Sequence, residues 1–377
     1  MLDRRALLAA GAVLAAPAVI RSPAQAQHQH GPAAGAPGAA GGGQPHHAPP
    51  FERLAQPGRV PLPDIHHEQK VLDGPAPKAA NQGRWIARAE LPLPRTEMAW
   101  AAELGGRMHV VGGYAEQRVD REYHHASTPA TDSWSVLAPL PRGANHVGVA
   151  TFRDRLYAFG GMIEQNRRPH GEVFVYTPGD NRWTAVRPLP RPCGAMACVT
   201  LGDRVHIVGG ARGDTNETRK SVDWHVVYDP VADTYTDARP LHLGRDHKGI
   251  VVFDNLIHVI GGRVDTFHTN SALHHTYDAR TDAWTTRNPM PTQRSGHGLV
   301  VYRGLIHAMG GEGTNRVFGV HEAFDPATDR WTQFAPMATP RHGMGAVVLG
   351  DSIHVAGGGP IVGGGVKSAV HEAFTLG

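Results

Sequence analysis

Glycine pairs that recur at a nearly constant spacing constrain this chain more than any other feature of its sequence. The pairs are separated by 48, 49, 52, 49 and 47 residues and begin at Gly112, Gly160, Gly209, Gly261, Gly310 and Gly357. An aromatic residue recurs with spacings of 49, 49, 52, 49 and 47, at Trp85, Trp134, Trp183, Tyr235, Trp284 and Trp331. Two markers that share a period near 50 residues indicate the blades of a β-propeller.

Each repeat predicts four strands. In the fifth repeat, an apolar run at 298–301 precedes a run at 305–309 that ends on the glycine pair. An alternating run to residue 326 follows, and the last strand begins at the aromatic residue. β-Branched residues and alternation favour strands, and a glycine pair suits a turn that needs positive φ. We therefore predict an all-β, six-bladed propeller over residues 83–377, with four antiparallel strands per blade.

The strand count also predicts how the ring closes. The last glycine pair is followed by a third strand at 370–374, and the chain stops at Gly377 before a fourth. The first aromatic residue, Trp85, has no strands of its own repeat before it. We expect residues 85–90 to complete blade six, which would pair both free sheet edges.

The repeats closely resemble the Kelch repeat. The segment 257–262, IHVIGG, resembles the Kelch strand that ends in a double glycine, and Tyr228, Asp229 and Pro230 with Tyr235 resemble the rest of the motif. The resemblance covers all six repeats, about 290 residues. It implies a propeller of the galactose oxidase central-domain-like superfamily. It does not imply one function, because Kelch rings serve many roles.

Residues 1–26 have the pattern of a signal peptide. Arg4 and Arg5 precede an apolar run that ends near Ile20 and is short for a membrane span, and small residues follow at 24–26. The paired arginines resemble a twin-arginine (Tat) signal, with an ordinary secretory signal as the alternative. We expect a periplasmic or secreted protein without a membrane span once the signal is removed.

Residues 27–82 are predicted to be a largely disordered linker, because Ala, Gly and Pro dominate its first part and cannot form a packed core. The linker carries four histidines, which are candidates for weak metal binding: His28, His30, His46 and His47. The alternative is a polar linker with incidental histidines. No cofactor is predicted, although a transition metal, copper or zinc, is left open.

The charge of the chain does not point to a nucleic-acid partner. Its formal net charge is +3, and the predicted signal peptide supplies +2 of this, from three arginines against one aspartate. The remaining +1 is not concentrated in any basic run, so no nucleic-acid binding is expected.

Each repeat has an arginine 16 to 18 residues before its glycine pair, just ahead of the strand expected to be innermost. These arginines and nearby polar residues are the candidate ligand-binding residues at the mouth of the channel. They are Arg95, Arg142, Arg191, Arg245, Arg294, Ser295, Arg341, His146, His247, His297 and His342. Convergent arginines bind carboxylate or phosphate, and the Arg294–Ser295 pair resembles eukaryotic Kelch rings that bind acidic peptides. The alternative is that the arginines only tie neighbouring loops together.

Ten of the 25 histidines occupy two repeated positions, one in the second strand and one in the third, in every repeat except the second. The pairs are His109 with His124, His206 with His225, His258 with His274, His307 with His321, and His354 with His371. Neighbouring antiparallel strands let each pair meet, so we predict neutral, buried, hydrogen-bonded imidazoles. Repeated two-histidine metal sites are the alternative. Cys193 and Cys198 lie too far apart along a strand for a disulfide and are expected to be free thiols.

Several functions are compatible with these residues. The sequence favours a monomeric binding module whose mouth takes a protein, peptide or glycan of anionic character. A second hypothesis is a sugar-acid mutarotase or epimerase of the sialic-acid type, which some exported bacterial Kelch rings resemble. A third is periplasmic metal handling by the linker histidines and the repeated pairs. Catalytic residues cannot be named, because no general base with an orienting partner stands out.

Overall fold

The computed structural model describes residues 75–377, except 99, 117–118, 166, 214–217 and 267. The expected signal peptide and the four linker histidines lie outside these residues. The end of the expected linker, residues 75–82, belongs to the ring. Ala76 is buried, and the backbone of Gln333 in blade five donates to the carbonyl of Pro77 and accepts from the amide of Ala79, at 2.8 and 2.9 Å.

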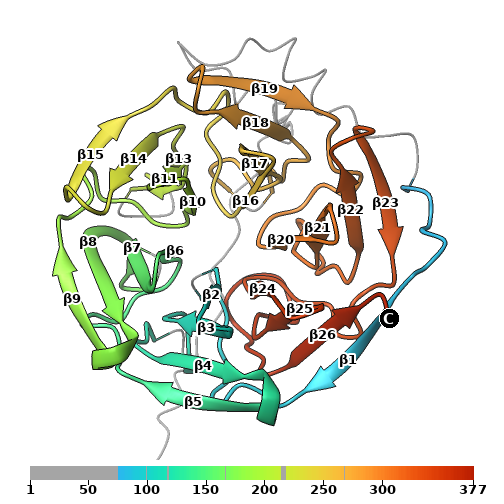
Figure 1. Ribbon diagram of the computed structural model, residues 1–377, viewed down its shortest axis with the longest axis horizontal. Helices are drawn as coiled ribbons and strands as arrows, with labels where there is room; N and C mark the ends of the chain where they lie inside the picture. The colour runs from blue at the N-terminus through green and yellow to red at the C-terminus, as the bar shows by residue number, and fades with distance from the viewer. Residues whose placement is uncertain (1–74, 99, 117–118, 166, 214–217, 267) are drawn as a thin grey trace, which may run out of the picture. The chain divides into compact units, whose positions relative to one another are not determined.

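Six four-stranded antiparallel sheets surround a single axis, which confirms the predicted six-bladed propeller (Figure 1). From the inner to the outer strand, blade one contains β2 (Ala102–Leu104), β3 (Arg107–Val111), β4 (His124–Thr128) and β5 (Ser133–Leu137). Blade two contains β6 (Gly148–Phe152), β7 (Arg155–Ile163), β8 (Arg168–Thr177) and β9 (Arg182–Val186). Blade three contains β10 (Ala197–Leu201), β11 (Arg204–Val208), β14 (His225–Asp229) and β15 (Thr234–Asp237).

The other three blades repeat this order. Blade four contains β16 (Gly249–Phe253), β17 (Leu256–Ile260), β18 (His274–Asp278) and β19 (Ala283–Arg287). Blade five contains β20 (Gly298–Tyr302), β21 (Leu305–Met309), β22 (His321–Asp325) and β23 (Arg330–Phe334). Blade six contains β24 (Gly345–Leu349), β25 (Ser352–Ala356), β26 (His371–Thr375) and β1 (Arg84–Arg88). Two single-turn 3₁₀ helices lie between the third and fourth strands of their own blades, Pro129–Thr131 in blade one and Pro178–Asp180 in blade two.

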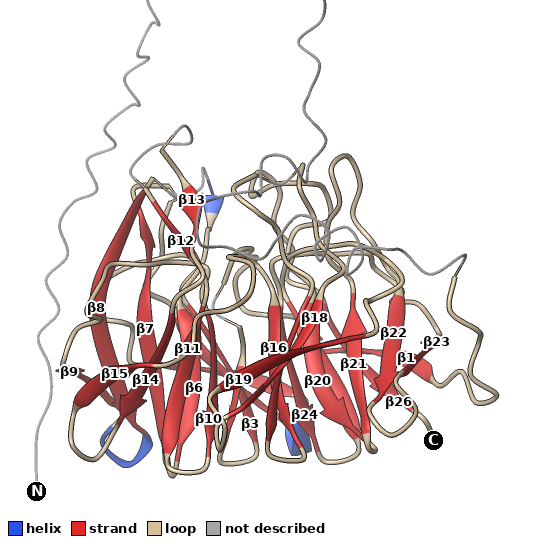
Figure 2. Ribbon diagram, turned by 90° about the horizontal axis from the view of Figure 1, so that it is seen from above, coloured by secondary structure: helices blue, strands red, loops and turns tan. Residues whose placement is uncertain are grey.

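One extra hairpin rises from blade three. It consists of β12 (Ala211–Arg212) and β13 (Lys220–Ser221), which pair antiparallel directly after the third glycine pair. Figure 2 shows this hairpin on the face where the loops that follow the glycine pairs gather, whereas short turns occupy the opposite face. Within the described ranges, no helix combines the length and apolar character that a membrane crossing requires.

Blade six closes as predicted, with its outer strand taken from the N-terminal side of the ring. β1 pairs antiparallel with β26 in a register that sets Trp85 opposite Phe374. The two rings are 5.4 Å apart, and the indole N–H of Trp85 donates to the carbonyl of Ala335 in blade five at 2.8 Å. The closing strand therefore joins two blades by packing and by a hydrogen bond.

The repeated aromatic residue makes the same contact in all six blades. Each side chain donates to a backbone carbonyl just beyond the outer strand of the preceding blade, at 2.8 to 3.1 Å, and the acceptors are Ala335, Ala89, Ala138, Arg187, Arg239 and Asn288. Tyr235 replaces tryptophan because its hydroxyl reaches the carbonyl of Arg187. The second sequence marker therefore reflects a ring of contacts between neighbouring blades.

The five histidine pairs meet as predicted. In each pair the Nδ1 of the second-strand histidine lies 2.8 to 2.9 Å from the Nε2 of the third-strand histidine. All ten are buried, and burial is the main cause that lowers each pKa. The pKa falls to about 4 for His206 and about 3 for its partner His225. In each contact one ring nitrogen must donate and the other must accept. Two neutral imidazoles can do this, whereas two charged imidazoles offer only donors.

These pairs predict that the ring unfolds in mild acid. Unfolded histidines titrate near pH 6.5, whereas His206 in the folded state takes a proton only near pH 4. The unfolded state therefore binds more protons between these values, and the free energy of unfolding decreases as the pH falls. One such group contributes on the order of 3 kcal/mol across this window. We expect the melting temperature to fall steeply from pH 6.5 to pH 4.

The control copies blade two, where Tyr157 and Val173 occupy the equivalent positions. The double variant His206→Tyr/His225→Val should make the melting temperature less dependent on pH, since it removes one of the five pairs. A melting temperature that is constant from pH 6.5 to pH 4 in the unmodified chain would contradict the neutral-pair interpretation.

Candidate functional site

The backbone of six equivalent loops forms a ring around the axis, where each outer strand leads to the next inner strand. One residue in each loop has φ between 51° and 62°, and these residues are Glu97, His146, Ala195, His247, Gly296 and Gly343. Five backbone hydrogen bonds of 2.8 to 3.4 Å link successive members, from His146 N to Glu97 O through to Gly343 N and Gly296 O. This chain of bonds holds the side chains of different blades at one point on the axis.

A second layer consists of the residues that follow the glycine pairs. Each forms an isolated antiparallel bridge to the preceding loop, and the bridges are Thr96–Tyr114, Asn145–Met162, Gly194–Ala211, Asp246–Arg263, Ser295–Glu312 and His342–Gly359. Where the residue after the pair is charged, as in Arg263 and Glu312, the bridge adds that charge to the loop ring. Two layers of loop residues therefore build one polar cluster.

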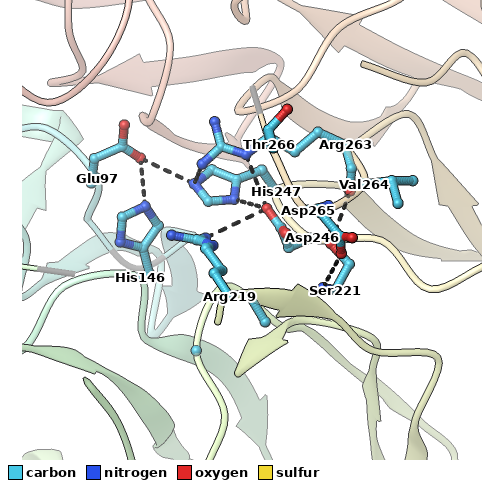
Figure 3. A network of polar contacts seen from close by, with 12 residues as sticks. Glu97, His146, Arg219, Ser221, Asp246, His247, Arg263, Val264, Asp265 and Thr266 are labelled. Atoms are coloured by element: carbon cyan, nitrogen blue, oxygen red, sulfur yellow. Dashed lines mark hydrogen bonds and ion pairs between the residues drawn. The ribbon is translucent and has the colours of Figure 1, made fainter. Parts of the chain in front are cut away.

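Arg263 connects three side chains of this cluster, and Figure 3 labels two of them, Asp246 and His247. Its Nε donates to Asp246 Oδ1 at 3.0 Å, its Nη1 to Glu312 Oε1 at 2.9 Å and its Nη2 to His247 Nε2 at 2.9 Å. Ser221, on β13, donates to the other oxygen of Asp246 at 2.6 Å. Burial alone would raise the pKa of Asp246, but Arg219, His247 and Arg263 hold it well below its usual range.

Glu97 lies among three imidazoles. Its Oε2 is 3.1 Å from His146 Nε2 and 3.7 Å from His247 Nε2, and its Oε1 is 3.1 Å from His342 Nε2. Burial raises the pKa of Glu97, yet His146 and His342 outweigh it and lower the pKa well below its usual value. Burial lowers the pKa of His342, but Glu97 and then Glu312 raise it overall. A Cβ at position 343 would lie 2.8 Å from Glu97 Oε2, so the glycine there leaves room for the carboxylate.

A cavity of about 570 Å³ lies directly against this cluster. Its charged lining consists of Arg167, Arg219, Arg263, Glu97, Asp265 and Glu312. His146 also faces it, so the cluster and the cavity share side chains. The volume falls within the range that small-molecule sites occupy.

Three of the four histidines predicted at the mouth do converge there: His146, His247 and His342. The fourth, His297, is buried elsewhere, against Gly249 and Gly261. Burial and the nearby Arg294 lower the pKa of His297 to about 3. Ser295 is also buried, and its backbone pairs with Glu312.

Four predicted arginines are completely buried behind the glycine pairs: Arg95, Arg245, Arg294 and Arg341. Arg341 donates to the carbonyl of Val370 at 2.8 Å and to Glu372 at 2.7 Å, and Arg294 donates to Glu322 at 2.6 Å. None of the four is among the described residues that line the axial cavity. Their placement differs from the expected mouth position and matches the alternative in which arginines tie loops together.

The other two predicted arginines, Arg142 and Arg191, lie at the surface and contact Glu172 and Asp237. The positions equivalent to the buried arginines are Ala144 and Cys193, whose carbonyls accept from the glycine pairs. Counting back from each glycine pair therefore misplaced these two residues by two positions.

Both cysteines are free and buried, as predicted. Burial raises the pKa of Cys193 to about 12 and that of Cys198 still further. Neither thiol is poised as a nucleophile, because the reactive form is the thiolate.

Sequence reasoning missed four residues of the cluster: Glu97, Arg219, Arg263 and Glu312. Two signals could have found three of them. A charged residue directly follows the glycine pair at Arg263 and Glu312. The 52-residue spacing, the longest in the chain, marks the inserted hairpin that positions Arg219.

Known proteins are similar in sequence to parts of this chain. Alpha-scruin of Limulus polyphemus is 26% identical over 196 residues, which cover 50% of this chain and 21% of that protein. A Kelch repeat-containing protein of Arabidopsis thaliana is 34% identical over 85 residues, or 20% of this chain and 19% of that protein. The chain thus spans about a fifth of the length of these curated relatives.

The solved structure of YjhT superposes with a TM-score of 0.65 at 14% identity, covering 75% of this chain and 95% of that one, which shows a shared fold. The model of the Attractin/LZTR1 β-propeller matches residues 108–359, more than half of the chain. Six Kelch-type blades and this match establish that the chain belongs to the Attractin/LZTR1 β-propeller family.

Proposed function

We propose that the protein is an exported ligand-binding propeller whose axial cavity takes a small acid with several hydroxyl groups, such as a sugar acid. Export rests on the signal-peptide pattern of residues 1–26. The ligand class rests on the lining of the cavity, which combines guanidinium groups with carboxylates.

The proposal rests mainly on the buried side chain of Arg219. Its side chain is 9% exposed and lines the cavity, and its Nη2 is 3.6 Å from Asp246 Oδ1. Among the described residues, that nitrogen has no hydrogen-bond partner. A buried guanidinium group with a free donor is costly unless another acceptor supplies the bond. A ligand carboxylate is the acceptor that fits its geometry best.

The acidic residues of the lining further restrict the class of ligand that the cavity can bind. Glu97 and Glu312 are accessible from the cavity and can accept hydrogen bonds from hydroxyl groups. The same carboxylates repel a second negative charge on the ligand. A monoanion with hydroxyl groups therefore suits the cavity better than a strongly acidic peptide.

A second candidate is catalysis of proton transfer on such an acid, as in a mutarotase or epimerase. The observation that favours it is the contact between Glu97 and His146, two groups that can exchange a proton and that both line the cavity. In addition, His247 Nδ1 is 2.5 Å from Asp246 Oδ1, which is a base with an orienting partner. Catalysis would be supported if the rate of anomer exchange increases with protein concentration and the Glu97→Gln variant no longer accelerates it.

Titration calorimetry with glucuronate, galacturonate and N-acetylneuraminate tests the binding proposal. We expect at least one acid to bind and Arg219→Gln to weaken it about 10- to 100-fold, the effect of losing a charged hydrogen bond. The control is Arg280→Gln, because Arg280 is exposed and forms an ion pair with the neighbouring Asp278. Binding that is equal in both variants, or no binding of any acid, would contradict the proposal.

A further inference from the structure

We infer that Glu97, His146 and His247 form a binding site for one divalent transition-metal ion, for which Zn²⁺ is the probe. The inference goes beyond the proposed function, because the ion needs no organic ligand to bind. It assigns a role to the centre of the polar cluster, at the base of the axial cavity.

The spacing of the three side chains fits such an ion. One ligand atom from each lies within 4.8 Å of the other two, and all three residues are buried. Glu97 Oε2 is 3.1 Å from His146 Nε2 and 3.7 Å from His247 Nε2. Two tetrahedral ligands at zinc bond lengths lie about 3.3 Å apart. Two histidines and one carboxylate are a ligand set that zinc and ferrous iron use with open positions.

The hydrogen bonds of both imidazoles direct their Nε2 atoms toward Glu97. His247 Nδ1 is 2.5 Å from Asp246 Oδ1, so this nitrogen carries the proton. His146 Nδ1 contacts the side-chain oxygen of Asn145, whose amide nitrogen donates to Asp120 and to the carbonyl of Met162. Each Nε2 then carries a lone pair, which in His247 accepts from Arg263 Nη2 and in His146 has no hydrogen-bond donor among the described residues. Outer carboxylate and amide partners orient metal-binding histidines in this way.

A bound ion would also give a partner to one buried atom that has none among the described residues. His146 is 7% exposed, and its Nε2 makes no hydrogen bond although Glu97 Oε2 is 3.1 Å away. In the neutral tautomer of His146 that has its proton on Nδ1, Nε2 and Glu97 Oε2 are two acceptor atoms that face each other. A cation between them turns this repulsion into coordination.

The surrounding charges favour a cation as well. Glu97, Asp246 and Glu312 carry three negative charges against two positive charges on Arg219 and Arg263. Arg263 Nη2 donates to His247 Nε2 at 2.9 Å, and an ion bound by His247 replaces that donor.

His342 positions Glu97 for this role. Its Nδ1 donates to the carbonyl of Gly359 at 3.0 Å, and its Nε2 lies 3.1 Å from Glu97 Oε1 and 3.3 Å from Glu312 Oε2. This contact holds one oxygen of Glu97 and leaves Oε2 for His146 and His247. Because Glu97 and His146 also line the cavity, an ion held between them would be accessible from its interior.

Zinc titration of the full chain tests the inference. The linker histidines are first removed as His28→Ala, His30→Ala, His46→Ala and His47→Ala, and bound metal is removed with EDTA. We expect one Zn²⁺ per chain in calorimetry with a competing chelator. Glu97→Gln and His146→Gln should each weaken binding by at least about 100-fold. The control Glu103→Gln alters an exposed carboxylate on β2 and should change nothing.

Electron paramagnetic resonance of the Cu²⁺-loaded chain with Glu97, His146 and His247 intact provides a first readout that does not depend on a variant's folding. Two imidazole ligands should split the signal through coupling to two nitrogens, and the coupling should decrease in His146→Gln. Zinc binding that is absent, or equal in Glu97→Gln and Glu103→Gln, would overturn the site, and so would a copper signal without nitrogen coupling. Because no organic acid is present, failure of acid binding would leave these results unchanged.

Discussion

Deleting residues 84–88 from the full chain is expected to abolish cooperative folding. These residues are β1, and without them the edge of β26 is unpaired. Blade six also loses the packing of Trp85 on Phe374 and the hydrogen bond from Trp85 to Ala335 of blade five. Loss of a well-packed tryptophan alone costs about 3 kcal/mol or more, and whole domains are stable by only about 5–15 kcal/mol.

Thermal unfolding followed by circular dichroism is the measurement. The control deletes five residues of the expected linker, 31–35, and should melt like the full chain. Trp85→Ala should fall between the two, with a lower melting temperature and a single transition. A β1 deletion that melts at the temperature of the full chain would show that the ring does not depend on this closure.

Replacing Arg263 by methionine is expected to lower the free energy of unfolding by about 3–5 kcal/mol, because removing one partner of a buried ion pair leaves the others uncompensated. Arg263 is 9% exposed, and its three donors serve Asp246, Glu312 and His247. Methionine fills part of the volume but donates no hydrogen bond. Asp246 and Glu312 would then lose their charged hydrogen-bond donor, and burial would disfavour their ionised forms.

Denaturant unfolding of Arg263→Met and of Arg280→Met measures this effect. Arg280 pairs with Asp278 at the surface, so its loss should cost less than about 1 kcal/mol. A change below about 1 kcal/mol in Arg263→Met as well would mean that the cluster does not depend on this side chain.

The features that depend on periodicity could be predicted from the sequence. Blade number and strand order follow from the two repeated markers, and the closure by β1 follows from counting strands. The contact between His206 and His225 follows from two fixed positions on neighbouring antiparallel strands. In each case the local pattern determines the contact, because the same geometry recurs in each blade.

The polar cluster is built from residues that differ between the repeats, and the repeat pattern does not predict such residues. Glu97, His247 and Glu312 come from loops of different blades and meet only because the ring brings those loops to one axis. An arginine precedes the inner strand in every repeat, so the arginines were predicted to form the site. Four of them instead satisfy backbone carbonyls and carboxylates behind the glycine pairs, as Arg341 does with Val370 and Glu372.

The central claim is that this propeller binds its ligand at the axis, above the polar cluster. A crystal structure of the full chain with the sugar acid that binds most tightly in titration tests it most directly. We predict density in the axial cavity, with the carboxylate within hydrogen-bond distance of Arg219 and hydroxyl groups near Glu97 and Glu312. An acid bound on the outer strands or on the face of short turns, with none at the axis, would contradict the claim.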